Sequence, residues 1–327
     1  MDAILAGTLI ASTLRVATPL ILGALAGLLA ERSGVIDLGL EGKMLFAAFA
    51  AAAAGSVFGS TPIALLLACG VAILLSWLHG FACVTHRGDQ VVSGMAINII
   101  AAGLTVVLGI AWFSQGGQTP PVSEDVRLKA LWPGAAAAFP NAPWVGAVLG
   151  EGLLAHNALV YLALVLVAIV WWLLYRTRFG LRLRATGENP HMVDAAGVSV
   201  LRLRYVALSL NGVLCGLAGS YLVLAQNASF GPNMTAGRGY MALAAMIFGH
   251  WRPVPALGAC LLFGFLDTVA VRLQGEKLPH IGEIPVQAIQ ALPYVLTVIL
   301  LAGFIGRNVA PQALRSEERR VGKECRL

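Results

Sequence analysis

The stretch LRVATPLILGALAG, residues 14–27, is apolar apart from Arg15, and no further charge follows until Glu31. An apolar run of about 17 to 25 residues is long enough to cross the hydrocarbon core of a bilayer as an α-helix. The rest of the chain has the same character, since 58% of its 327 residues are hydrophobic and only 12% are charged. Soluble domains carry about twice that share of charged residues. The composition therefore predicts an integral membrane protein with many spans.

Apolar runs recur along the chain and predict an all-α polytopic membrane protein. The long runs lie at 14–30, 61–85, 93–115, 157–175, 205–226, 254–274 and 288–306. Two shorter runs, rich in small residues, lie at 43–58 and 238–250. We expect about nine transmembrane passes, within a range of about eight to ten, some of them broken or short. Residues 2–12 form either an interfacial helix or the start of the first pass. We expect them to remain in the mature chain as a membrane segment rather than to be cleaved as a signal peptide.

Arginines concentrate in one connection between the expected spans, and this asymmetry orients the chain. The crowded connection carries Arg176, Arg178, Arg182, Arg184, Arg202 and Arg204. Because positive residues favour the cytoplasmic side, we expect residues 180–200 to be cytoplasmic. Counting passes from there puts Arg32, Arg87, Arg252 and Arg307 on the same side. The proline-rich connection 116–156 then lies outside.

Three blocks of sequence occur twice, in the same order and at nearly constant spacing. The opening stretch recurs as LRYVALSLNGVLCG, residues 203–216. EGKMLFAA from Glu41 is matched by RGYMALAA from Arg238, and AINIIAAGLTVVL from Ala96 by AIQALPYVLTVIL from Ala288. This order predicts an internal repeat of the fold.

The predicted repeats cover residues 14–115 and 203–306. Each holds about four passes, and the single pass at 157–175 separates them, so the second repeat is inverted in the membrane. Inverted repeats are typical of transporters, whose pathway lies at the repeat interface near the middle of the bilayer. The repeat therefore favours a transporter over a receptor or a membrane-bound enzyme.

Several functional classes are disfavoured by motifs that the chain lacks. The net charge of +6 comes from short loops between apolar runs and does not indicate nucleic-acid binding. The five cysteines show neither disulfide nor metal-site spacing. No GxxxxGKS or GxxxxGKT phosphate loop, HExxH or GxSxG motif occurs. We expect no metal, no cofactor and no enzymatic activity, and an ATPase that drives transport would be a separate chain.

Long blocks of the sequence resemble permease subunits of ABC importers. TRFGLRLRATGENPHMVDAAGVSV, residues 177–200, resembles their cytoplasmic coupling segment, and ERSGVIDLGLEGKML, residues 31–45, resembles the N-terminal signature of permeases for nucleosides and simple sugars, a branched-chain-type family. GDQVVSGMAINIIAAGLT, MTAGRGYMALAAMIFGHWRP and PYVLTVILLAGFIGR fit the same family, so the resemblance covers about residues 10–310. The chain is most similar to the subgroup that works with basic membrane lipoproteins carrying purine nucleosides. Asp37 stands where that subgroup often has Asn and places an extra acid near the pathway.

This resemblance implies a permease subunit of an ABC importer that performs no covalent chemistry itself. It would translocate nucleosides, with simple sugars as the next candidate, across the bacterial inner membrane. The implied partners are ABC ATPase subunits, a second permease chain that is identical or related, a periplasmic or lipid-anchored substrate-binding protein, and membrane lipid. The alternative from another class is an ion- or proton-coupled secondary transporter that uses Glu41 as a proton site and needs no ATPase.

Within the coupling segment, HMVDAAGV, residues 191–198, carries the local signals of a short amphipathic helix. Pro190 suits the first turn, Asn189 suits the cap, and Gly197 would end the helix. The resemblance implies that this helix docks on the ATPase, whereas the alternative is a solvated basic loop. The residues assigned to docking are Glu188, Asn189, Pro190, His191, Asp194, Ala195, Ala196 and Gly197.

Five polar residues within apolar elements are candidates for the translocation pathway. Glu41 falls opposite Arg238 in the repeat alignment, so we expect the two side chains to face each other, directly or through water. The alternative is that both lie unpaired at the lipid headgroups. Asn98 and Gln290 align between the repeats, and Asn211 lies in a later pass. These three amides either bond a neighbouring helix or line the pathway.

We expect residues 1–314 to form one permease transmembrane domain. The charged segment 315–327 reads like a translated sequencing adapter, so we expect it to be non-native and assign it no function.

Overall fold

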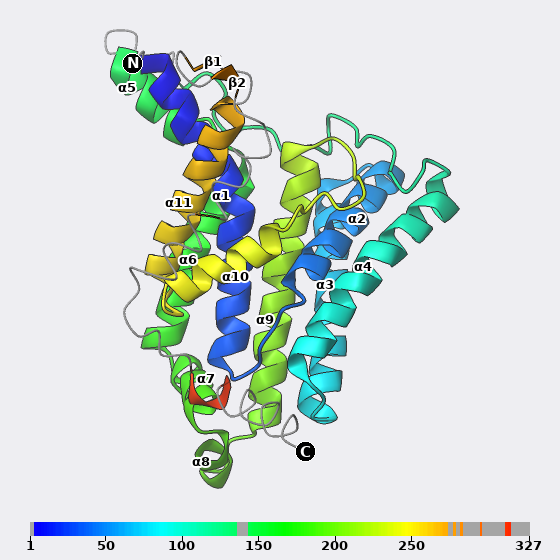
Figure 1. Ribbon diagram of the computed structural model, residues 1–327, viewed down its shortest axis with the longest axis vertical. Coiled ribbons are helices and arrows are strands. Elements are labelled where there is room, and N and C mark those ends of the chain that lie inside the picture. Colours follow the sequence, from blue (N-terminus) through cyan, green and yellow to red (C-terminus); the bar gives the residue numbers. More distant parts are fainter. Residues whose placement is uncertain are drawn as a thin grey trace.

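The computed structural model describes residues 3–135 and 143–273, together with residues 277–278, 282–283, 295 and 311–314. This part of the chain is a bundle of long helices that share roughly one axis (Figure 1). Seven of its helices are long and apolar enough to cross a membrane. They are α1 (Ala3–Arg32), α2 (Leu40–Phe58), α3 (Thr61–Gly80), α4 (Gln90–Phe113), α6 (Ala158–Arg176), α9 (Val200–Tyr221) and α11 (Pro253–Leu273).

Shorter elements complete the described chain. π-Helical turns extend α3 as η1 (Phe81–Thr85) and α9 as η4 (Leu222–Gln226). The other short helices are α5 (Pro143–Val145), η3 (Gly146–Leu154), α7 (Arg178–Glu188), α8 (Pro190–Ala195) and α10 (Arg238–Phe248). Strands β1 (Lys277–Leu278) and β2 (Gly282–Glu283) pair antiparallel.

The helices agree with most of the expected passes. Residues 3–32 form one continuous helix. The structure therefore favours residues 2–12 as the start of the first pass rather than as a separate interfacial helix. The short element expected at 238–250 is α10, which is apolar but too short to span a membrane alone. The pass expected at 288–306 lies outside the described residues, apart from residue 295. The count of nine passes and the inverted repeat therefore stay predictions.

Helices α1 and α9 form the centre of the bundle, and the other long helices surround them. Two glycines of α9 allow its close approach to α3. A Cβ at Gly212 would lie 2.6 Å from the Cα of Ile73, and one at Gly216 would lie 2.5 Å from the Cα of Cys69. Small residues at helix contacts are the usual means of close packing in membranes, where burial of apolar surface drives little association.

Pro19 lies inside α1 and leaves one backbone carbonyl of the helix without its usual partner. Proline has no N–H, so the carbonyl of Arg15, four residues earlier, loses its intrahelical hydrogen bond. The Gln226 side chain donates to this carbonyl at 2.8 Å. The carbonyl that Pro19 leaves unpaired in α1 is therefore satisfied by the last residue of η4, and this hydrogen bond holds Gln226 beside Arg15.

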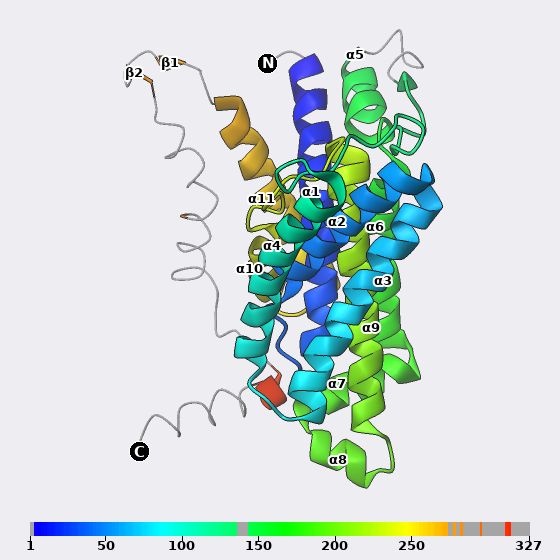
Figure 2. The same cartoon turned by 90° about the vertical axis from the view of Figure 1, so that its right-hand side faces the viewer.

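The two ends of the bundle differ in what they carry. The N-terminus of α1 and α5 lie at one end, called the outer end below, and α7 and α8 lie at the other, called the inner end (Figures 1 and 2). The connections expected on opposite sides of the membrane thus lie at opposite ends of the molecule. Which end faces the cytoplasm follows from the arginine distribution and stays a prediction.

Candidate functional site

Helices α2 and α10 both begin inside the bundle rather than at its ends. A non-helical lead, residues 33–39, runs from the inner end to the start of α2, and a second lead, residues 227–237, runs from the outer end to the start of α10 (Figure 1). Backbone N–H groups at a helix start have no intrahelical acceptor. Inside an apolar bundle, each start therefore needs polar partners from elsewhere in the chain.

Glu41, in the first turn of α2, supplies those partners to α10. Its carboxylate accepts hydrogen bonds from the backbone N–H of Gly237 at 2.8 Å and of Gly239 at 2.6 Å. The carboxylate is buried and its negative charge faces the positive end of the α10 dipole. A Cβ at Gly239 would lie 2.6 Å from the Cα of Glu41, so the two helix starts are in direct contact.

A direct pair of Glu41 with the Arg238 side chain is not found among the described residues, and contact through water stays a prediction. The repeat alignment does bring position 238 to Glu41, but the carboxylate binds the backbone on either side of it. The Arg238 guanidinium instead donates to the Gln226 side chain at 3.5 Å. The reason is that the unpaired N–H groups at the start of α10 are fixed in place and need an acceptor, whereas the arginine is long enough to reach another partner.

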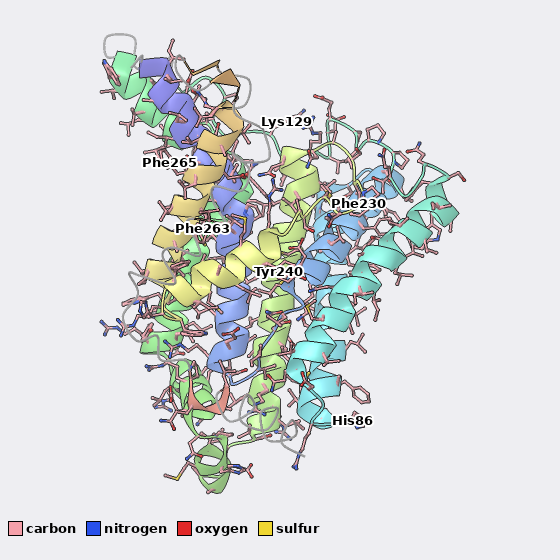
Figure 3. The ribbon with its side chains drawn as sticks, in the orientation of Figure 1. His86, Lys129, Phe230, Tyr240, Phe263 and Phe265 are labelled. Carbon is pink, nitrogen blue, oxygen red and sulfur yellow. The ribbon has the colours of Figure 1, made fainter. Side chains whose placement is uncertain are left out.

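Asn98 of α4 joins both helix starts. Its Oδ1 accepts from the backbone N–H of Gly42 at 2.8 Å, and its Nδ2 donates to the Leu38 carbonyl at 2.9 Å and to the Tyr240 hydroxyl at 2.8 Å. Tyr240 lies on α10 at the middle of the bundle (Figure 3). These bonds are those that the helix-bridging interpretation of Asn98 requires, and a role in lining the pathway stays a prediction.

A fully buried ion pair lies next to this junction. The Lys43 Nζ is 2.5 Å from Asp37 Oδ2, and both side chains are 0% exposed. Lys43 also donates to Asn211 Oδ1 at 3.2 Å, and the Ser76 hydroxyl donates to the same oxygen at 3.1 Å. The other Asp37 oxygen accepts from the Gly39 N–H at 3.1 Å. The pair therefore ties the lead before α2 to α2 itself, α3 and α9.

Sequence reasoning assigns no function to Lys43 and treats Asp37 only as an extra acid near the pathway. The structure shows instead that the two residues are partners. A signal for this role is present in the sequence, because Lys43 lies inside a short apolar element, two residues after Glu41. Charges in such elements are normally paired or functional.

The rest of the lead before α2 is held by side chains of α3 and α4. The backbone N–H of Ile36 donates to Gln90 Oε1 at 2.5 Å, and its carbonyl accepts from His79 at 2.9 Å. The other ring nitrogen of His79 lies 3.1 Å from the Ser93 hydroxyl. Non-helical backbone at this depth is stable only when its polar groups are satisfied by protein in this way.

The segment expected to dock on an ATPase forms α8 at the inner end (Figures 1 and 2). Asn189 caps the helix by accepting from the Met192 N–H at 3.2 Å, and Pro190 occupies the first turn. Gly197, with φ of 77°, follows its end. Val193 is buried and anchors the helix, while Met192 is 70% exposed. The exposed docking candidates are Glu188, Asn189, His191, Asp194, Ala195, Ala196 and Gly197.

The inner end of α1 connects α7 to the loop between α10 and α11. A Cβ at Gly187 of α7 would lie 2.4 Å from the Arg32 carbonyl oxygen, so the two backbones touch. The Arg32 side chain donates through Nε and Nη2 to the Trp251 carbonyl at 2.9 and 2.8 Å, and the Trp251 indole donates to Glu31 at 2.5 Å. Contacts therefore run from α7 through the end of α1 to the loop that follows α10.

The candidate Gln290 lies outside the described residues. Among the residues that are described, no group of three or more His, Cys, Asp or Glu side chains lies close enough to hold a metal ion.

Replacing Glu41 by Gln is expected to loosen the junction of α2 and α10. One amide oxygen could still accept, but the amide NH2 would face a second N–H donor, and each lost bond to a charged acceptor costs about 1.5–3 kcal/mol. We expect a lower thermal unfolding temperature of the detergent-purified protein. Glu124→Gln is the control, because its exposed carboxylate makes only a distant 3.8 Å pair with Arg127. Equal unfolding temperatures for the two variants would contradict the assignment.

Known proteins are similar in sequence to this chain over nearly its whole length. The family model described as branched-chain amino acid transport system / permease component matches residues 9–303. The Nucleoside ABC transporter permease protein NupC of Lactococcus lactis subsp. cremoris (strain MG1363) is 37% identical over 314 residues, 93% of this chain and 94% of that protein. The Guanosine ABC transporter permease protein NupQ of Bacillus subtilis (strain 168) is 36% identical, with the same coverage of both chains. This chain therefore belongs to the family of branched-chain amino acid transport system permease components.

Proposed function

We propose that the chain is the membrane-spanning permease subunit of an ABC importer that translocates nucleosides. The observation that carries this proposal is the 37% identity over 93% of the chain to a nucleoside permease. As a family member the chain works with an ATPase and a substrate-binding protein, and ATP hydrolysis belongs to the separate ATPase chain. Seven long apolar helices in the described part of the chain make it a multi-pass membrane protein, which we place in the bacterial inner membrane.

The ATPase would bind at α8. This helix lies at the inner end, is capped by its own sequence, and presents an exposed face with Met192 at its centre. A short helix with an exposed apolar anchor suits a groove in a partner. The substrate-binding protein, periplasmic or lipid-anchored, would then bind the opposite, outer end.

A second permease chain, identical or related, would complete the pathway. Helices α3 and α4 expose large apolar side chains, among them Leu66 and Ile99, at 72% and 70% exposure. Such faces suit either membrane lipid or another apolar helix. We assign part of this surface to the second permease and the remainder to lipid.

The inverted repeat is supported by how α2 and α10 lie. Their sequences align in the repeat, and each follows a non-helical lead that enters from the opposite end of the bundle. Their starts meet at Glu41 inside the bundle, where transporters with inverted repeats place their broken helices. Alternating access would then move one repeat against the other about this junction.

The alternative, a proton-coupled transporter that uses Glu41 as its proton site, has less support. Both oxygens of Glu41 are occupied by backbone N–H groups of α10, so the carboxylate has a structural partner that this alternative does not require.

Uptake by the reconstituted importer separates the two functions. Proteoliposomes with this chain, its ATPase, the second permease and the binding protein should accumulate labelled nucleosides only with ATP on the ATPase side. An ATPase whose phosphate-loop lysine is replaced serves as the control and should abolish uptake. Uptake driven by a proton gradient without ATP would overturn the proposal.

A further inference from the structure

Tyr240 of α10 is an exposed aromatic side chain at the depth of the membrane interior. It is 41% exposed and lies at the middle of the bundle (Figure 3). Its partner Asn98 lies about 12 Å from the start of α4 at Gln90 and about 22 Å from its end at Phe113, at 1.5 Å for each residue. The hydrocarbon core of a bilayer is about 30 Å thick, so both side chains lie within it.

At this depth an exposed side chain faces either lipid or the translocation pathway. Lipid-facing tyrosines concentrate at the membrane–water interfaces, where the hydroxyl meets water, rather than in the hydrocarbon core. On α4, Ala102 lies one turn beyond Asn98 on the same side and is small and exposed. Ile100, 46% exposed, lies on the other side of the helix and suits lipid. The side of α4 that meets Tyr240 therefore has the character of a pathway wall.

Asn98 orients the Tyr240 hydroxyl. Its Oδ1 accepts from the backbone N–H of Gly42, and its Nδ2 donates to the Leu38 carbonyl, so two backbone groups fix which end of the amide points where. The second hydrogen on Nδ2 goes to the Tyr240 hydroxyl at 2.8 Å. The hydroxyl is therefore the acceptor in this bond, and its own hydrogen remains for water or a solute in the pathway.

The charges around Tyr240 are already matched within the chain. Glu41 faces the start of α10 through two backbone N–H groups, and the pair of Lys43 with Asp37 is 0% exposed. The Arg238 guanidinium is bonded to η4. Tyr240 therefore offers a solute two neutral features, an aromatic face and a hydroxyl hydrogen. They suit an uncharged ligand with a flat ring and oxygen acceptors, which a nucleoside has in its base and its ribose.

We propose that Tyr240 contacts the nucleoside during transport, with its ring stacked on the base and its hydroxyl donating to a ribose oxygen. Asn98 is the positioning residue that turns the hydroxyl toward the pathway. This contact rests on the proposed nucleoside import and names the side chain that reads the solute. Tyr240 lies in the first turn of α10, beside the junction with α2 at Glu41, so the solute would be held where the two helix starts meet.

A first experiment determines whether this side of α4 is in water. The complete importer is reconstituted in lipid nanodiscs and treated with a water-soluble methanethiosulfonate during ATP turnover, and the parent chain gives the background rate. Ala102→Cys should react at least about tenfold faster than Ile100→Cys, because only a thiol in water forms the reactive thiolate. Ile100→Cys is the matched control, since it lies two residues away on the other side of α4. Inosine should slow the reaction of Ala102→Cys.

A second experiment uses this protection to measure affinity in the same complex. Adding Tyr240→Phe to Ala102→Cys should raise the inosine concentration for half-maximal protection by about two- to tenfold, because one neutral hydrogen bond is lost. Tyr240→Leu should raise it by a further factor of about five or more, because the stacking ring is lost too. Tyr205→Phe is the matched control and should change nothing, since it removes a hydroxyl bonded to Thr85 at 2.7 Å near the start of α9.

Ribose alone should protect at least about fivefold less well than inosine, because it has no base to stack. An Ala102→Cys thiol that does not react, or one that inosine protects equally with and without Tyr240→Phe, would overturn the assignment of Tyr240 while nucleoside uptake by the parent importer stands. Equal protection by ribose and inosine would overturn it as well, because the ring would then not read the base. If the parent importer carries no nucleoside, the proposed function fails and the Tyr240 contact fails with it.

Discussion

Lys43→Met is expected to remove most of the folded protein from the membrane. Asp37 would be left as an uncompensated carboxylate that is 0% exposed, and removing one partner of a buried ion pair costs about 3–5 kcal/mol. Asn211 would lose a donor at the same time, although Ser76 would still donate to it. The measurement is the yield of monodisperse protein after detergent extraction, with its thermal unfolding temperature.

The double variant Asp37→Asn with Lys43→Met shows whether charge pairing is the cause. It leaves no buried ion at this pair, so it should recover a large part of the lost stability, since coupled sites are non-additive. Lys129→Met is the matched control, because its 3.7 Å pair with Asp125 is largely exposed and exposed pairs contribute about 1 kcal/mol or less. A Lys43→Met protein as stable as the parent, or a double variant no better than the single one, would show that the pair is not what holds this region.

Ala196→Trp and Asp194→Arg in the α8 region should strongly reduce uptake while leaving the membrane core folded. Both positions are exposed at the inner end, so neither change fills or empties the core. The tryptophan adds bulk where a small residue permits close approach, and the arginine reverses a charge beside other arginines. Loss of one central interface contact commonly costs about 2 kcal/mol or more, so we expect ATPase co-purification and uptake to fall by at least about tenfold.

Val57→Trp is the control for added bulk, since Val57 is 65% exposed at the other end of the bundle. It should leave ATPase co-purification and unfolding temperature unchanged. Variants at 194 and 196 that keep both the ATPase and uptake would identify the segment as an ordinary solvated loop. If they dock normally but transport poorly, the defect would lie in the contact between Gly187 and Arg32 that leads on to Trp251.

Local rules are enough to predict the long helices and α8. Hydropathy alone places the spans, since each needs only a sustained apolar run. For α8, the cap at Asn189, the proline at its first turn and the left-handed Gly197 are all neighbours in sequence, so their effects can be inferred without a fold.

The polar centre can be predicted only in part. The starts of α2 and α10 lie together, as the aligned blocks led us to expect, but side-chain charge alone does not predict the bonds of Glu41, because its donors are backbone groups. The Lys43 contact with Asn211 joins residues 168 apart, and only the packing of α9 against α2 and α3 places Asn211 there.

The Asp37–Lys43 pair has a consequence for energetics under voltage. Both charges belong to one short stretch of chain, so any movement of the start of α2 carries them together. A lone lysine carried across the whole field would do electrical work of about 2.3 kcal/mol for each 100 mV. The pair itself carries equal and opposite charges and does almost none, so the net charge that the start of α2 carries is that of Glu41. Without the lysine, Asp37 and Glu41 together would make any movement of this segment along the field about twice as sensitive to the membrane potential.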